Sequence, residues 1–95
     1  MRPVARLGDQ GVPHCSPYTI ATGSPTVYAD LRPVASVGDF STPHLVPSRR
    51  CFPHAAPIIT GSPTVYVNLR PVARVGDSLA GCTFVATGSF SVFAG

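Results

Sequence analysis

The sequence predicts a small all-β protein built from three repeats around a pseudo-threefold axis. One phrase of eight residues occurs three times in the 95 residues, as RPVARLGD, RPVASVGD and RPVARVGD. The chain contains 11 prolines and 9 glycines but no lysine or glutamate, so helix breakers are common and two of the best helix formers are missing. A hydrophobic share of 44% is too high for a disordered chain. We therefore expect short strands and tight turns in one compact, tapering domain.

The repeat unit is longer than this phrase and continues through both chain ends. Residues 23–39 (GSPTVYADLRPVASVGD) match residues 61–77 (GSPTVYVNLRPVARVGD). The last copy, GSFSVFAG at 88–95, stops where the next RPVAR would begin, and the first copy begins there at Arg2. The two ends thus complete one unit. This predicts a closed single domain over residues 1–95 with neighbouring termini.

Each unit divides into short strands and turns. The segments PTVY at 25–28 and 63–66, and the run after each Arg-Pro, contain β-branched and aromatic residues bounded by Gly, Pro, Asn and Asp. Such runs are typical of strands. The pairs Asp-Leu at 30–31 and Asn-Leu at 68–69 stand where a strand must reverse before Arg-Pro. The Gly-Asp pair that ends each phrase predicts a tight turn, because glycine permits a positive φ and aspartate bonds nearby backbone N–H groups.

The charge pattern excludes several classes of protein. Seven arginines and four aspartates give a formal net charge of +3. Only Arg49 and Arg50 are adjacent, and no aromatic residues alternate with basic ones, so we expect no nucleic-acid surface. No apolar run approaches the about 18 residues of a membrane span, and no secretory signal follows Arg2 and Arg6. We expect synthesis in the cytoplasm, where the three cysteines stay reduced.

Metal-binding side chains follow the three repeat aspartates at one spacing. His14, His44 and Cys82 each stand five residues after the Gly-Asp aspartate of their unit. Equivalent positions of a threefold object converge on its axis, so these side chains are expected to meet. His54 lies in an insert of the second unit and, like His14 and His44, follows a proline. Three imidazoles and one thiolate predict a single structural Zn²⁺ bound tetrahedrally by His14, His44, His54 and Cys82.

The other two cysteines leave an alternative for this ligand set. Cys51 and His54 form the pattern C-F-P-H, whose spacing suits a chelate, so Cys51 could replace His54 or Cys82. Cys15 faces away from His14 if that stretch is extended, because side chains alternate along a strand. We interpret Cys15 as a small buried apolar residue.

The repeated phrase resembles the proline-alanine-alanine-arginine signature of PAAR-repeat proteins. The resemblance lies at residues 3–6, 33–36 and 71–74, each followed by Gly-Asp. The GSPTVY and GSFSVF segments are similar to the family's GSPTV element, so the resemblance covers essentially the whole chain. The second signature position is valine instead of alanine, and Ser36 replaces the arginine of the middle copy. Neither departure touches the predicted metal ligands.

The resemblance implies a pointed cone of β-structure with a zinc ion near its vertex. Proteins of this family sit on the blunt end of a trimeric β-helical spike, either VgrG of type VI secretion or the central spike of a contractile phage tail. The expected function is non-enzymatic: one copy per trimer caps and sharpens a spike that pierces a target-cell envelope and touches the target membrane only transiently. The expected location is the tip of the contractile spike, delivered to the cell exterior or the target cell, or in a phage the tip of the virion tail. The family's association with effector domains adds effector proteins to the expected partners.

Two other functions account for less of the sequence. A catalytic zinc normally has three protein ligands and an open position for water, whereas this chain offers four candidate ligands and no glutamate as a base. A zinc-stabilised module that binds another protein or nucleic acid is the second alternative. The absence of lysine and of a basic run weighs against nucleic acid.

Overall fold

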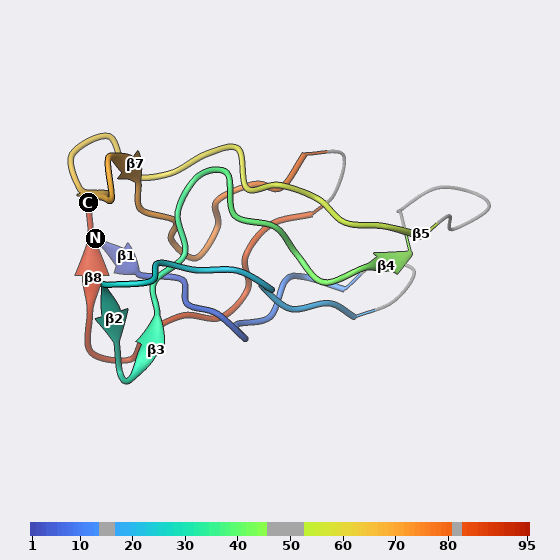
Figure 1. Ribbon diagram of the computed structural model, residues 1–95, viewed down its shortest axis with the longest axis horizontal. Helices are drawn as coiled ribbons and strands as arrows, with labels where there is room; N and C mark the ends of the chain where they lie inside the picture. Colours follow the sequence, from blue (N-terminus) through green and yellow to red (C-terminus); the bar gives the residue numbers. More distant parts are fainter. Residues whose placement is uncertain (14–16, 46–52, 81–82) are drawn as a thin grey trace.

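The fold of the described residues consists of short strands, turns and isolated bridges. A computed structural model describes residues 1–13, 17–45, 53–80 and 83–95 (Figure 1). No helix occurs within these ranges, so they contain no helix that is long and apolar enough to cross a membrane. The all-β class predicted from the sequence is confirmed. The strands are β1 (Arg2–Pro3), β2 (Tyr28–Ala29), β3 (Arg32–Pro33), β4 (His44–Leu45), β5 (Pro53–His54), β6 (Tyr66–Val67), β7 (Arg70–Pro71) and β8 (Phe93–Ala94).

The strands form four antiparallel pairs that divide between the two ends of an elongated molecule. The pairs are β1–β8, β2–β3, β4–β5 and β6–β7. The molecule measures 37 × 24 × 21 Å along its principal axes. Three of the pairs gather at the end that carries both termini, on the left in Figure 1, and β4–β5 lies towards the other end. We call the first end the base and the second end the tip.

The three base hairpins are copies of one structure, and the third is formed by the chain ends. In the first two, the reversal uses two residues at positive φ, Asp30 (53°) with Leu31 (65°) and Asn68 (51°) with Leu69 (66°). These values belong to two-residue turns whose twist matches that of the strands they join. The third hairpin pairs β8 with β1 with no turn between them, so the termini lie side by side (Figure 1). The neighbouring termini expected from the repeats are confirmed.

The three repeats meet on an axis formed by three alanines. The backbone N–H of Ala5 donates to the C=O of Ala73 (2.9 Å), that of Ala73 to Ala35 (3.0 Å), and that of Ala35 to Ala5 (2.9 Å). These bonds close a ring, and all three alanines are 0% exposed. Three bridges between successive repeats surround the ring: Arg6↔Val34, Ser36↔Val72 and Val4↔Arg74. The pseudo-threefold arrangement predicted from the sequence is thus present in the backbone.

The core lies above and below this ring. Towards the base, Val4, Val34 and Val72 pack in one cluster with Ala29, Val67 and Ala94. The alanine ring itself belongs to a second cluster, whose remaining members are Tyr18, Ile20, Ala56, Ile58, Leu79 and Val85. The bridges Ile20↔Ser41, Ile58↔Leu79 and Gly11↔Val85 join each repeat to the next at this level. Every level of the core is therefore shared among all three repeats.

The Gly-Asp turns adopt the geometry that the sequence predicts. Gly8, Gly38 and Gly76 have φ values of 88°, 97° and 92°. The aspartate that follows each glycine accepts a hydrogen bond from a backbone N–H three residues earlier, at 2.8 Å for Asp9 and 2.8 Å for Asp39. A Cβ atom at Gly38 would come within 2.9 Å of the Arg70 guanidinium. Glycine is therefore needed for backbone conformation and for the approach of the next repeat.

A larger side chain on the axis should destabilise the protein. Ala35→Leu adds three carbons at a position with 0% exposure, and the ring of hydrogen bonds prevents the backbone from moving away. We expect the free energy of unfolding to fall by about 1–3 kcal/mol, measured by denaturant unfolding. Ala21→Leu, at an exposed alanine, is the control and should change it by less than about 0.5 kcal/mol. Equal effects of the two variants would contradict the axial role of the alanine ring.

Candidate functional site

The tip loops are the segments in which the sequence places the zinc ligands. Three bridges open them at equivalent positions, each directly after a repeat aspartate: Gln10↔Thr19, Phe40↔Pro57 and Ser78↔Phe84. The three loops therefore start from equivalent backbone bridges in the three repeats. Two of the predicted ligands lie on described backbone, because β4 and β5 pair with His44 directly opposite His54. The structure thus brings these two positions together.

The rest of the predicted ligand set is not tested by the structure. His14 and Cys82 lie outside the described residues, as do the alternative ligand Cys51 and the predicted core residue Cys15. Within the described residues there is no group of three metal-binding side chains. The set His14, His44, His54 and Cys82 therefore stays a prediction.

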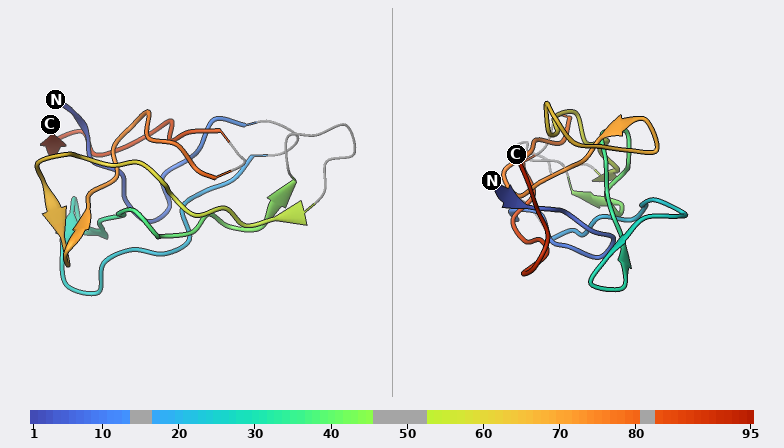
Figure 2. Two further views of the ribbon diagram at one scale, coloured as in Figure 1. Left: turned by 90° about the horizontal axis from the view of Figure 1, so that it is seen from above. Right: turned by 90° about the vertical axis from the view of Figure 1, so that its left-hand side faces the viewer.

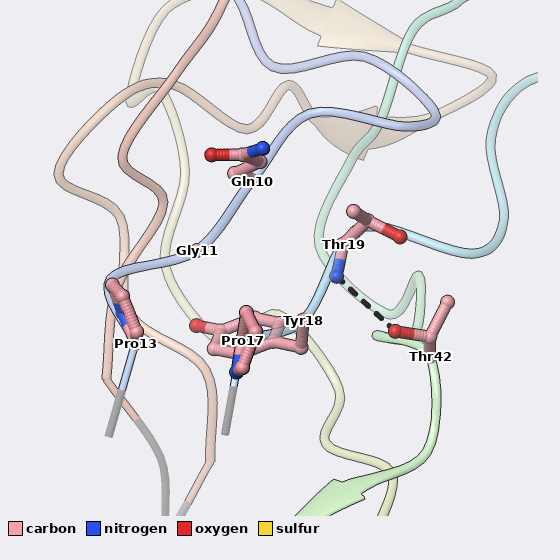
Figure 3. Close-up of a pocket in the computed structure, with 7 residues that line it drawn as sticks. All are labelled: Gln10, Gly11, Pro13, Pro17, Tyr18, Thr19 and Thr42. Atoms are coloured by element: carbon pink, nitrogen blue, oxygen red, sulfur yellow. Dashed lines mark hydrogen bonds between the residues drawn. The ribbon is translucent and has the colours of Figure 1, made fainter. Parts of the chain in front are cut away.

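A shallow cavity of about 210 Å³ lies beside the first tip loop (Figure 3). Tyr18 is only 3% exposed, and its ring lies so close to Gly11 that a Cβ atom there would come within 1.9 Å of it. The Tyr18 hydroxyl pairs with the Thr83 hydroxyl (3.0 Å), and Thr42 accepts from the backbone N–H of Thr19 (3.1 Å). The seven lining residues include no carboxylate or imidazole, so the cavity offers no acid–base pair: Gln10, Gly11, Pro13, Pro17, Tyr18, Thr19 and Thr42.

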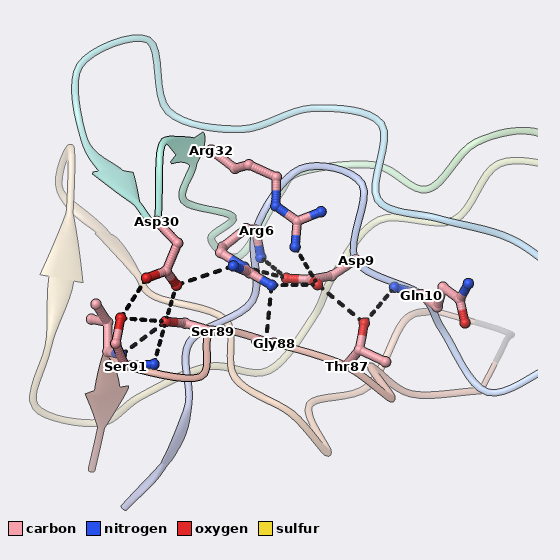
Figure 4. A network of polar contacts seen from close by, with 10 residues as sticks. Arg6, Asp9, Gln10, Asp30, Arg32, Thr87, Gly88, Ser89 and Ser91 are labelled. Atoms are coloured by element: carbon pink, nitrogen blue, oxygen red, sulfur yellow. Dashed lines mark hydrogen bonds and ion pairs between the residues drawn. The ribbon is translucent and has the colours of Figure 1, made fainter.

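The signature arginine of the first repeat is the centre of a buried polar network (Figure 4). Arg6 donates to Asp9 through Nε (2.9 Å) and Nη2 (3.0 Å), to Asp30 through Nη1 (3.0 Å), and to the C=O of Gly88 (3.1 Å). The hydrogen bond to Asp9 is the main reason why the pKa of Arg6 is raised, and it outweighs the opposing effect of burial. Arg6 therefore connects three segments that are distant in sequence.

A second arginine joins each repeat to its neighbour. Arg32 pairs with Asp9 at 3.0 Å, Arg70 with Asp39 at 3.5 Å, and Arg2 with Asp77 at 3.5 Å. Each of these arginine side chains is 40–43% exposed, whereas the three aspartate side chains are 3–6% exposed. The three pairs form a belt of ion pairs around the axis next to the base.

The signature arginine itself is present in only two of the three repeats. Arg74 contacts Asp77 as Arg6 contacts Asp9, with Nε at 3.0 Å and Nη2 at 3.1 Å. Burial alone would raise the pKa of Asp77, but hydrogen bonds from Arg74 and Thr60 outweigh it and lower that pKa. In the middle repeat, Ser36 donates to Asp39 at 3.2 Å and provides no positive charge.

The turns of the base hairpins differ in charge in the same way as the signature positions that they face. Asp30 accepts hydrogen bonds from Ser89 and Ser91 of the neighbouring hairpin, which lower the pKa of Asp30 together with the Arg6 guanidinium. Asn68 occupies the equivalent turn position, where it accepts from Ser24 (2.5 Å) and donates to Thr26 (3.1 Å). By the symmetry of the repeats, Asn68 faces Ser36 as Asp30 faces Arg6. The repeat without the arginine therefore also lacks the carboxylate that would need it.

The base exposes apolar side chains in threefold sets. Leu31, Leu69 and Met1 stand at equivalent positions and are 95%, 96% and 88% exposed. Two further sets are more than one-third exposed, and with the first they form what we call the base ring: Met1, Val27, Tyr28, Leu31, Val65, Tyr66, Leu69, Val92 and Phe93. Clustered exposed apolar residues mark interaction surfaces in soluble proteins. No individual residue of this face could be predicted from the sequence, because the same strand pattern also fits a buried core.

The charge match between Ser36 and Asn68 is testable by a double-mutant cycle. Asn68→Asp alone should destabilise the protein, because the new carboxylate has no guanidinium beside it. In Ser36→Arg with Asn68→Asp, the new pair should reproduce the contact of Arg6 with Asp30. We expect a favourable coupling free energy of about 1 kcal/mol between the two substitutions, measured by denaturant unfolding. Strictly additive effects would show that the two positions do not interact.

Comparison with known families identifies one motif in the chain. The family model described as PAAR motif matches residues 52–95. This range contains the third signature copy and the C-terminal hairpin segment that completes the first repeat. No curated protein matches the chain.

Proposed function

We propose that this chain, a PAAR-repeat protein, is the non-enzymatic cap that closes and sharpens a trimeric β-helical spike. The family indicates a spike-tip role in secretion systems or contractile phage tails. The finer proposal is that one copy sits on the blunt end of one VgrG or phage central spike trimer and is the first part to meet a target-cell envelope. The observation that carries it is the threefold base of a single chain, with its exposed apolar base ring.

The base supports a trimeric partner for two reasons. Three equivalent hairpins surround the long axis, as the end-on view in Figure 2 shows, so three identical partner chains can each meet the same surface. A β-helical trimer also ends in three strand edges and an apolar core, which are an aggregation hazard unless something covers them. The base ring carries only uncharged side chains and suits such a partner. One molecule can therefore cover all three chain ends of the trimer at once.

The body of the molecule suits a structural task. It is longer than it is wide, at 37 × 24 × 21 Å, and the base lies at one end of the long dimension. The alanine ring, the core bridges and the belt of ion pairs each connect all three repeats. A load on the tip would therefore be shared among the repeats. Such a cap would act at the spike or tail tip after synthesis in the cytoplasm, and effector proteins could travel with it.

A single structural zinc ion at the tip is part of the proposal. Two observations support it: the tip loops leave equivalent bridges, and β-pairing places His44 opposite His54. His14, His44, His54 and Cys82 would hold the ion, with Cys51 as the alternative to His54 or Cys82. Imidazole and thiolate are donors that zinc prefers. The ion would supply a cross-link between the three repeats, and because the unfolded chain has no such site, its binding energy would contribute to folding.

The docking proposal predicts a stoichiometry of one chain per spike trimer. Mass measurement of a purified complex with a trimeric VgrG or phage central spike should give that ratio. Replacing Leu69 with Asp should weaken binding at least about tenfold, because a charge would be buried against an apolar partner. Ala86→Asp, at an exposed position away from the base ring, is the control and should leave the affinity unchanged. Three chains per trimer would contradict the symmetry argument.

The metal proposal predicts linked losses of zinc and stability. Cys82→Ser should lower the zinc content and the melting temperature together, since zinc binding contributes to folding. Cys15→Ser should change neither. Zinc content is measured by elemental analysis and stability by thermal unfolding. Loss of zinc in Cys51→Ser with full zinc in Cys82→Ser would assign the thiolate to Cys51, and a purified protein without any metal would refute the site.

A further inference from the structure

The base ends in three strands whose outer edges are unpaired in the described structure. Each inner strand of a base hairpin is bonded on both sides: Pro33 of β3 accepts from Leu7 (2.8 Å), and β3 also pairs with β2. The same holds for β7, where Pro71 accepts from Val37 (2.9 Å), and for β1, where Pro3 accepts from Val75 (2.9 Å). The outer strands β2, β6 and β8 pair on one side only.

The register identifies the residues whose backbone groups face outwards. In an antiparallel pair, residues alternate between those bonded across the pair and those whose N–H and C=O point to the other side. Val34 donates to Val27 at 3.0 Å, and the Tyr28↔Pro33 pair comes next along the hairpin. Tyr28 is therefore one of the outward-pointing residues. Equivalent bonds, from Val72 to Val65 and from Val4 to Val92 (3.0 Å each), make Tyr66 and Phe93 its counterparts.

These three edges face away from the body of the molecule. Because β3, β7 and β1 bond to the body, the strands on their other side form the outermost layer of the base, which the side view in Figure 2 shows at the end that carries the termini. Tyr28, Tyr66 and Phe93 are 57%, 59% and 45% exposed. Exposed strand edges are normally protected by charged side chains, proline or a bulge. No charged residue lies within β2, β6 or β8, so these edges lack that protection.

We infer that the trimeric partner adds one further strand to each of β2, β6 and β8, through backbone hydrogen bonds at Tyr28, Tyr66 and Phe93. This inference rests on the proposed function, because it needs a partner with three strand edges around one axis. Each contact is a short case of strand addition, in which main-chain bonds give affinity and side chains give specificity. The inward residues of the same strands, Ala29, Val67 and Ala94, are 1–9% exposed and already close the core. The partner is therefore held by its edges and by the outward apolar side chains, with no deep insertion.

The charge at the base agrees with this occupant. The nine residues of the base ring have uncharged side chains, and the belt arginines are already paired with Asp9, Asp39 and Asp77. A strand end with apolar, uncharged side chains therefore fits against the ring. A nucleic acid or an acidic segment would meet no unpaired arginine side chain in the described part of the base.

Amide hydrogen exchange on the full chain tests the inference directly. In the free protein the amides of Tyr28, Tyr66 and Phe93 should exchange fast, whereas Val34 and Val72, which are bonded within the hairpins, should exchange slowly. Addition of a purified trimeric VgrG or phage central spike should slow the exchange of the first three amides at least about tenfold. Formation of the complex without that protection would overturn the inference and leave the proposed function standing. Absence of any complex would overturn the proposed function itself.

Proline substitution gives a second, independent test. Tyr28→Pro with Tyr66→Pro removes two outward N–H groups that are not needed for the hairpins, and proline is tolerated at such edge positions. The matched control, Tyr28→Ala with Tyr66→Ala, removes the same side chains and keeps both N–H groups. We expect the proline variant to bind the spike about 100-fold more weakly than the alanine variant, about tenfold for each bond, with a similar melting temperature.

Equal affinity of the two variants would overturn the inference. If the proline variant does not fold, the hydrogen-exchange measurement decides whether the partner adds strands, because it needs no substitution. Slow exchange of the three amides in the protein alone, together with a dimeric mass, would also overturn the inference, because a second copy would then be the occupant of the base.

Discussion

The ring of hydrogen bonds between Ala5, Ala35 and Ala73 is the constraint on which the rest of the structure depends. It brings three repeats into contact at a spacing that admits no side chain larger than a methyl group. Once the backbones are fixed at this spacing, each Gly-Asp turn lies beneath the arginine of the next repeat, and each base hairpin lies beside the next hairpin. The core is then a stack of shared layers in which no repeat has an interior of its own.

The polar network explains how such a narrow molecule stays together where there is little apolar volume. Arg6 and Arg74 are buried, yet each has carboxylate and carbonyl partners on several sides. Buried charges are tolerated when they are paired and hydrogen-bonded in this way. Arg74 bonds within its own repeat, whereas Arg6 also pairs with Asp30 of the neighbouring repeat and so strengthens a contact that the small core leaves weak. A zinc ion at the tip, where the apolar clusters end, would strengthen the contacts between repeats in the same way.

Much of the fold follows from the sequence, because repetition is a stronger signal than strand propensity. The repeated phrases predicted the threefold backbone, the Gly-Asp turns and the pairing of the chain ends. Two-residue strands such as β1 are too short for side-chain periodicity to define, so their registers come only from contacts between repeats. The role of the signature arginine could not be assigned from Ser36 alone. Comparing Asp30 with Asn68 as well would have provided the missing signal, since the two differences occur together in space. The zinc ligand set stays a prediction, and the structure shows only that the backbone pairs His44 with His54.

The paired differences at Ser36 and Asn68 show what a single chain gains over a true trimer. In an assembly of three identical subunits, every substitution appears at all three corners, and a change of charge must be accommodated three times. Here each corner is encoded separately, so Ser36 can give Asp39 a neutral contact while Arg6 and Arg74 keep their ion pairs with Asp9 and Asp77. The close packing of Tyr18 on Gly11 is a second example, because the equivalent backbone bonds of the described residues join Ser41 to Ala56 and Leu79 to Thr83. The base can therefore keep a threefold surface for a threefold partner, while the three flanks of the molecule diverge from one another independently in evolution.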